Sequence, residues 1–156
     1  MTTKLTSCEE LAAYRKMLGT RRDPNRTCVT VCGGTGCRAC QGLAVAAAFR
    51  KAFQEQALEG KVDLRVTGCL GFCEKGPVVT IRPKGLIYVK VTAADAAEIV
   101  NKTVLRDEEV ERLFLKDPKT GKRQRTREEI AFYKNQTPVI FGANFELDPQ
   151  SIDDYL

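Results

Sequence analysis

The sequence predicts an α/β fold: a small mixed sheet with flanking helices, preceded by an N-terminal helix and followed by an extended C-terminal tail. Apolar residues between positions 27 and 104 repeat in the order strand, helix, strand, strand, strand, helix. Two glycine-containing cysteine segments each follow a predicted strand. With 156 residues the chain is long enough for one domain with extensions.

The first 25 residues form a predicted helical extension. The segment from Ser7 to Glu10 has the pattern of a capping box and opens a helix that Gly19 closes. One face of this helix carries Leu11, Tyr14 and Leu18.

The central domain is predicted to span residues 26–104. A strand from Thr27 to Val31 is followed by a helix from Arg38 to Leu58, which Gly60 stops. The buried face of this helix is expected to carry Leu43, Ala46, Phe49 and Phe53. Alternating Val62, Leu64 and Val66 form the next strand, and a strand-helix-strand unit makes the two strands parallel with a right-handed crossover.

A hairpin completes the predicted sheet. The turn from Arg82 to Gly85 joins a strand at Val78–Arg82 to one at Leu86–Val91, and Thr92 with Asp95 caps a helix through Val100. This combination of elements is a small sheet of thioredoxin-like type.

The cysteines carry the strongest functional signal. Cys32 and Cys37 bracket three glycines and a threonine, and Cys69 and Cys73 bracket Leu-Gly-Phe. Four thiolates in such loops suit an iron-sulfur cluster, because its irons need soft ligands and glycines let backbone N–H groups approach the sulfurs. We expect these amides to lie around Gly33–Gly36 and Leu70–Phe72.

Other cysteine chemistries remain open from the residues alone. Cys37 and Cys40 at a helix start also suit a thioredoxin-like dithiol oxidoreductase. A plant-type ferredoxin set would use Cys40 in place of Cys73, but the compact Cys69–Cys73 turn favours Cys73. A structural zinc-binding interaction module is the third option, although the spacing matches no ordinary zinc motif. Cys8 and Cys28 are interpreted as incidental or buried thiols.

Composition narrows the function further. The chain has no histidine, which excludes Rieske clusters and catalytic pairs that need histidine. It has no tryptophan and a formal charge of only +5, so we expect no nucleic-acid partner. We also expect a cytoplasmic protein with no membrane span, because there is no secretory signal and the longest apolar run, Gly42–Phe49, is too short.

The C-terminal part is more charged. Residues 105–136 are predicted to be a helix from Asp107 to Leu115 followed by a linker. In residues 137–156 a strand is expected at Pro138–Phe141, and Asp148 caps a helix that starts at Pro149. A helix this short does not offset its nucleation cost, so we expect the chain to have been cut or a partner to complete it.

The two cysteine segments, together with Glu74–Val79, resemble the thioredoxin-like 2Fe-2S ferredoxin family over Thr27 to Val104. This family includes the small iron-sulfur subunit beside the NADH-binding flavoprotein of respiratory complex I. Residues 132–140 and 148–156 resemble the opening of that flavoprotein, so 137–156 is either a truncated start of a flavoprotein domain or a partner-docking tail. The combination is similar to the β subunits of NADH-linked multimeric iron hydrogenases and formate dehydrogenases.

The resemblance implies a one-electron carrier with a 2Fe-2S cluster on Cys32, Cys37, Cys69 and Cys73. Its expected partners are an NADH- and FMN-binding flavoprotein domain or subunit and other iron-sulfur subunits. FMN, NADH and a 4Fe-4S cluster are expected only on a partner or on a missing C-terminal region. The chain alone is therefore not expected to catalyse NADH oxidation.

Overall fold

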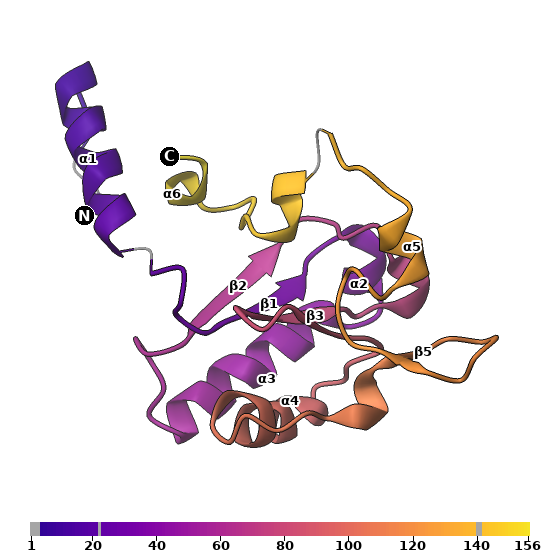
Figure 1. Ribbon diagram of the computed structural model, residues 1–156. Coiled ribbons are helices and arrows are strands. Elements are labelled where there is room, and N and C mark those ends of the chain that lie inside the picture. Colours follow the sequence, from indigo (N-terminus) through magenta and orange to yellow (C-terminus); the bar gives the residue numbers. More distant parts are fainter. Residues whose placement is uncertain (1–3, 22, 140–141) are drawn as a thin grey trace.

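A four-stranded mixed sheet lies at the centre of the computed structural model, which describes residues 4–21, 23–139 and 142–156 (Figure 1). The order of the strands is β2-β1-β3-β4. The first two strands are parallel and the other two add as an antiparallel hairpin: β1 (Cys28–Cys32), β2 (Asp63–Thr67), β3 (Val79–Arg82) and β4 (Leu86–Tyr88). The predicted α/β class and mixed sheet are confirmed.

The register places both cysteine segments at one edge of the sheet. Cys28 pairs with Asp63 and Cys32 with Thr67, so β1 and β2 end side by side. Each cysteine segment follows its strand directly. Because β1 and β2 are parallel, their carboxyl ends lie at the same edge of the sheet, and the two segments meet there.

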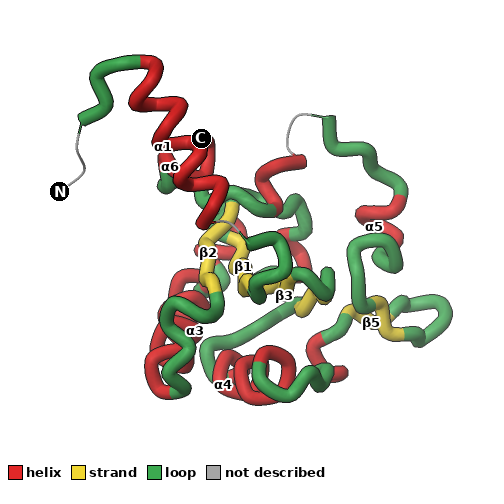
Figure 2. Tube along the Cα trace, turned by 60° about the vertical axis from the view of Figure 1, so that its left-hand side comes forward, coloured by secondary structure: helices red, strands yellow, loops and turns green. Residues whose placement is uncertain are grey.

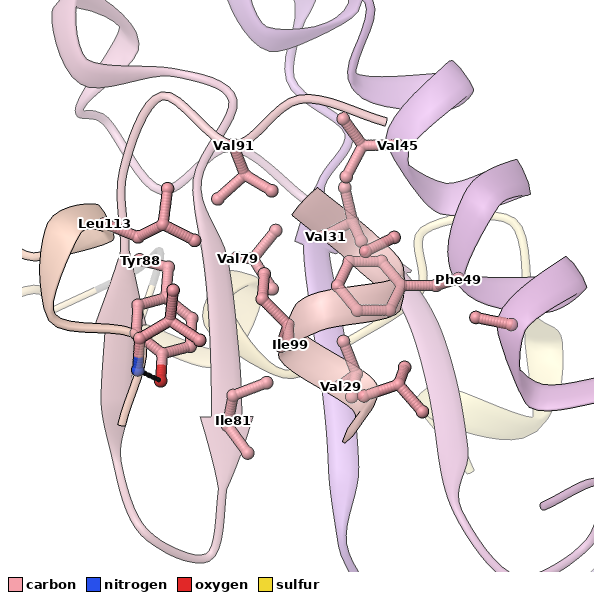
Figure 3. Packing of buried hydrophobic residues seen from close by; sticks show 14 of the residues in the cluster. Val29, Val31, Val45, Phe49, Val79, Ile81, Tyr88, Val91, Ile99 and Leu113 are labelled. Atoms are coloured by element: carbon pink, nitrogen blue, oxygen red, sulfur yellow. Dashed lines mark hydrogen bonds between the residues drawn. The ribbon is translucent and has the colours of Figure 1, made fainter. Parts of the chain in front are cut away.

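Helices α3 (Gly42–Glu55) and α4 (Asp95–Ile99) cover one face of the sheet (Figure 1). Figure 3 shows Phe49 of α3 directed toward Val29 and Val31 of β1. These three side chains are fully buried. Alternate residues of a strand point to the same face, so this valine pair anchors the core beneath the helices.

The predicted single helix from Arg38 to Leu58 is wrong. The chain forms α2 (Thr35–Ala39) and then α3, with a break at Gln41, whose φ of 65° is left-handed. A left-handed residue interrupts the helix and resets its axis. The buried face therefore begins at Val45, and Leu43 is half exposed.

The hairpin prediction is confirmed. Gly85 has a positive φ of 70° at the turn between β3 and β4. The Asp95 carboxylate accepts hydrogen bonds from the amide and the hydroxyl of Thr92, both at 2.7 Å. Thr92 and Asp95 are thus bonded to each other, but α4 begins at Asp95, and its N-cap is Ala94, which makes no side-chain cap hydrogen bond. The helix continues past the expected end as a π-helical turn, η2 (Val100–Val104).

The predicted helix from Asp107 to Leu115 is also wrong, because only one 3₁₀ turn, η3 (Glu111–Leu113), forms there. Phe114 packs on Tyr88 with ring centroids 5.1 Å apart, and the Val110 amide donates to the Tyr88 hydroxyl at 3.1 Å. Packing against the core thus decides the local conformation. Val110, Leu113 and Phe114, in the part of this segment that was expected to be a helix, belong to the core.

The chain then returns along the open edge of β4. After a projecting hairpin of β5 (Leu115–Lys116) and β6 (Arg123–Gln124), the Arg125 carbonyl accepts from the Ile87 amide at 2.7 Å. Thr126 bridges to Leu86. This pairing leads the chain into α5 (Ala131–Lys134), beside the cysteine segments.

The C-terminal residues lie against the sheet face opposite the helices (Figure 1). The ion pair of Arg82 with Glu146 has an N–O distance of 2.6 Å, and the Gly68 amide donates to the Leu147 carbonyl at 3.2 Å. These contacts follow η4 (Gly142–Phe145). Within the described ranges, every helix is too short or too polar to span a membrane.

The two terminal helices lie side by side (Figure 2). The Tyr14 hydroxyl of α1 (Cys8–Arg21) donates to Asp153 of α6 (Ile152–Tyr155) at 2.9 Å. Helix α1 runs past Gly19, and α6 begins after Ser151 instead of at Pro149. Of the predicted strand at 138–141, the first two residues are not in a strand and the other two lie outside the described residues.

Candidate metal centre

Four cysteines meet where β1 and β2 end. Cys32 is the last residue of β1 and Cys37 lies in α2, whereas Cys69 follows β2 and Cys73 opens the 3₁₀ turn η1 (Cys73–Lys75). Backbone hydrogen bonds join the two segments: the Gly33 amide donates to the Thr67 carbonyl at 2.9 Å, and the Cys32 amide donates to the Val78 carbonyl at 2.9 Å.

The glycines of the first segment allow this close approach. A Cβ atom on Gly34 would lie 2.9 Å from the Cys69 sulfur, and one on Gly36 would lie 2.9 Å from the Cys73 Cβ atom. Real Cβ atoms essentially never come so close to a neighbour. The backbone around Cys37 therefore lies directly against the side chains of the second cysteine pair.

The two pairs differ in exposure. Cys32 and Cys37 are buried, with exposed fractions of 2% and 1%, whereas Cys69 and Cys73 are exposed. The centre thus has a side enclosed by protein and a side open to solvent.

Neighbouring donors favour the thiolate of Cys32. The Cys37 thiol makes the largest contribution, and the amides of Leu70 and Gly34 add to it, so the pKa of Cys32 falls to about 6 although burial opposes this. The pKa of Cys37 is raised, because its proton is shared with the Cys32 sulfur and the site is buried.

The exposed pair shows mutual repulsion. The Gly71 amide, 3.3 Å from the Cys69 sulfur, favours the thiolate of Cys69, but burial and the negative charges of Cys32 and Cys73 outweigh it and raise the pKa of Cys69. Several thiolates so close together are stabilised by bound cations. The donor set therefore fits a metal centre.

The Gly71 amide donates to the Cys69 sulfur at 3.3 Å, within the range Leu70–Phe72 that was expected to supply donors. The amides of Gly34 and Leu70, also in the expected ranges, lower the pKa of Cys32. The Val78 amide, which approaches Cys37, was not predicted. Val78 lies outside both cysteine segments, so the sequence does not indicate that its amide is near Cys37. The pairing of β3 with β1 brings it there.

The arrangement of the four thiols distinguishes a single metal ion from a two-iron cluster. Across the described ranges, no three histidine, cysteine, aspartate or glutamate side chains are arranged to hold a single metal ion. A 2Fe-2S cluster is held differently, with two thiolates on each iron and sulfides between the irons. Two pairs of thiols facing one another suit that geometry.

The remaining cysteines lie elsewhere. Cys40 is exposed after α2 and lines a separate hollow of about 440 Å³ that includes Gln41, Lys90 and Thr92 but none of the four converging thiols. Cys28 is buried at the opposite end of β1, and burial raises its pKa. Cys8 is exposed on α1.

A second apolar cluster encloses the buried side of the centre. Besides Cys32 and Cys37 it contains Leu70, Val78, Ile87, Val89, Ile130 and Tyr133. Burial, with a further contribution from the negative charge of Cys32, raises the pKa of Tyr133. Sequence reasoning missed Tyr133 because nothing around position 133 indicates that the chain returns to the cysteines.

Comparison with known proteins identifies a family. A family model described as thioredoxin-like 2Fe-2S ferredoxin matches residues 1–104. A 2Fe-2S ferredoxin of Clostridium pasteurianum is 34% identical over 77 residues, which cover 49% of this chain and 76% of that protein. A 2Fe-2S ferredoxin of Aquifex aeolicus is 45% identical over 49 residues, covering 31% of this chain and 44% of that protein.

Solved structures show the same fold. The thioredoxin-like 2Fe-2S ferredoxin from Aquifex aeolicus superposes with a TM-score of 0.52 and 33% identity, covering 56% of this chain and 87% of that one. The predicted thioredoxin-like fold is thus confirmed. The chain belongs to the thioredoxin-like 2Fe-2S ferredoxin family, and its cofactor is a 2Fe-2S cluster.

Proposed function

We propose that the protein is a one-electron carrier whose 2Fe-2S cluster is held by Cys32, Cys37, Cys69 and Cys73. The observation that carries this proposal is the convergence of these four thiols from two segments at one edge of the sheet. When bound, such a cluster supplies a centre that gains and loses a single electron. The chain holds it, donates backbone amides to its sulfur ligands and encloses one side.

Electrons are expected to enter and leave on the side of Cys69 and Cys73. These two residues are exposed, whereas Cys32 and Cys37 lie beneath the apolar cluster that contains Ile130. A partner that docks over the exposed pair comes closest to the redox centre.

Cations gather beside this exposed side, where Lys90 and Lys116 accompany Lys75, which pairs with Glu74, and Arg112, which pairs with Asp95 and Glu98. A hollow of about 360 Å³ adjoins the turn that Cys73 opens, and four cations line it: Lys75, Lys90, Arg112 and Lys116. Clustered positive charge steers an acidic partner toward its docking site. Association through this surface should weaken as salt is added.

We further propose that the carrier works within an NADH-linked oxidoreductase, with a flavoprotein domain or subunit as its partner. The resemblance of residues 132–140 and 148–156 to the opening of such a flavoprotein supports this. The clustered glycines of this chain lie between its cysteines, and a flavin phosphate would need a glycine-rich loop of its own. The chain is therefore a relay, with NADH oxidation occurring on the partner or further along the polypeptide.

The dithiol alternative fits the site less well. A nucleophilic cysteine needs exposure and a lowered pKa. Cys37 is only 1% exposed and its pKa is raised.

Single substitutions test the ligand set. Cys73→Ser should empty or grossly perturb the centre, because an oxygen replaces a thiolate, whereas Cys40→Ser and Cys8→Ser should leave the visible and electron paramagnetic spectra unchanged. The opposite pattern for Cys73 and Cys40 would establish the plant-type ligand set. Mixing with NADH tests the proposed flavoprotein partner. The isolated protein should stay oxidised in the presence of NADH and become reduced only when an NADH-oxidising flavoprotein is added.

A further inference from the structure

The Tyr133 side chain places its hydroxyl group in the buried interior. Tyr133 is 3% exposed, and its hydroxyl oxygen has no hydrogen-bond partner within the part of the chain that the structure describes. Burying a hydroxyl without a hydrogen bond is unfavourable, because the group loses its bonds to water. Such a group usually has a partner among ligands or ordered water.

The position of this hydroxyl is fixed from several sides. Residues 125–126 pair with the edge of β4, and the following turn places Tyr133 in α5. Its ring meets Phe72 edge-on at 5.6 Å and Phe145 edge-on at 5.7 Å between centroids. These contacts hold the ring, so the hydroxyl cannot turn to solvent without disrupting the packing.

Tyr133 packs in the same buried cluster as Cys32 and Cys37. Besides burial, negative charge on Cys32, Cys37 and Cys69 raises the pKa of its hydroxyl, whereas Arg127, 5.8 Å from the ring centroid, lowers it. A phenol is protonated at neutral pH and is therefore a donor. Sulfur atoms that carry negative charge are acceptors for it.

We propose that the Tyr133 hydroxyl donates a hydrogen bond to a sulfur atom of the 2Fe-2S centre and raises its reduction potential. The inference rests on the proposed function. The centre is more negative after it gains an electron, so a donor stabilises the reduced form more than the oxidised form. Tyr133 is thus a positioning and tuning residue, and it lies outside residues 1–104, which match the family.

The proposal links the C-terminal segment to the redox properties of the centre. Tyr133 keeps its place only while α5 packs on Phe72 of the second cysteine segment and Phe145 packs on the Tyr133 ring. Any partner that displaces this segment would remove the donor and make the centre harder to reduce.

The test is Tyr133→Phe in the full chain loaded with its cluster, with reduction followed by electron paramagnetic resonance at defined potentials. If the hydrogen bond is stronger in the reduced form than in the oxidised form by about 1.4 kcal/mol, its loss should lower the reduction equilibrium constant about tenfold, which is ~59 mV for one electron. In the wild-type protein in D₂O, electron-nuclear double resonance should show an exchangeable deuteron coupling that is missing in the variant.

The matched control is Tyr88→Phe. Tyr88 is also buried, but its hydroxyl is bonded to Thr103 at 2.8 Å and to the Val110 amide, away from the cysteines. This variant should lose stability and keep the reduction potential of the wild type. Because Tyr133→Phe removes only a hydroxyl without a partner, it should fold.

An unchanged potential and an unchanged deuteron spectrum in Tyr133→Phe would overturn the proposal. That outcome differs from failure of the proposed function, in which the wild-type protein itself would hold no cluster and give no signal to titrate.

Discussion

Phe132 stacks on Phe72, with ring centroids 4.6 Å apart and planes inclined by 8°. Phe72 lies between Cys69 and Cys73, so a residue of the C-terminal segment braces the loop that carries the exposed thiol pair. Such an aromatic pair is worth about 0.5–1.5 kcal/mol beyond its buried area. The loop should therefore depend on the tail for its rigidity.

Phe132→Ala should hasten loss of the cluster several-fold. The measurement is the decay of visible absorbance in the presence of an iron chelator. Phe132→Tyr keeps the ring and should decay at the wild-type rate. Equal decay of Phe132→Ala and wild type would show that the stack does not support the loop.

Gly36→Ala should reduce the iron content of the purified protein. Position 36 lies in α2, where alanine is favoured over glycine by about 1 kcal/mol in helix propensity, but the added Cβ would lie 2.9 Å from the Cβ of Cys73. The clash should displace one member of the exposed pair. Gly19→Ala in α1, where nothing lies within 4 Å of the added atom, should keep full iron content. A wild-type iron content in Gly36→Ala would contradict the close contact between position 36 and Cys73.

Asp95→Ala should destabilise the fold by about 1 kcal/mol, the usual net contribution of a hydrogen bond. Burial opposes ionisation of Asp95, but the hydrogen bonds from Thr92 and the ion pair with Arg112 outweigh it and lower its pKa. A carboxyl with a lowered folded pKa stabilises the fold at every pH above its unfolded pKa of about 3.9 and loses that effect only as the pH falls through the folded pKa.

The destabilisation by Asp95→Ala should thus be the same at pH 8 and pH 5.5 in urea unfolding. Glu59→Ala, at an exposed position, is the control and should change little. A destabilisation that shrinks between these two pH values would mean that the pKa of Asp95 is not lowered.

Truncation after Val104 should destabilise the domain. It removes Leu113, Phe114 and Ile130, which are buried against the core or the cysteines. Each such side chain contributes about 1.5–3 kcal/mol by its burial. A chain that ends at Gln136 keeps these residues and should retain its cluster spectrum through purification. Equal stability of both truncated chains would show that the segment 105–136 behaves as a linker after all.

The residues of the sheet were predictable because each strand carries its own signal. Alternating Val62, Leu64 and Val66 and the turn at Gly85 indicate their elements locally, and cysteine pairs directly after strands locate the centre. The break at Gln41 was not predictable, since glutamine has no preference for left-handed backbone. The break lies between α2, which carries Cys37, and α3, which packs on the sheet. The two helices need different axes to do both.

The C-terminal segment was misjudged for a related reason. Its charged composition hides Val110, Leu113 and Phe114, whose spacing suggests a helix but whose burial depends on Tyr88, more than twenty residues earlier. The same holds for Tyr133, which reaches the cysteines only because residues 125–126 pair with β4. Contacts between distant parts of the chain leave no local pattern.

Iron and acid-labile sulfide analysis of protein purified without oxygen, combined with electron paramagnetic resonance after reduction, tests the central claim most directly. The proposed site predicts about two irons and two sulfides per chain and an S = 1/2 signal from the reduced protein, both lost in Cys73→Ser. Colourless protein with stoichiometric zinc, or metal-free protein that reduces disulfides through Cys37 and Cys40, would contradict it.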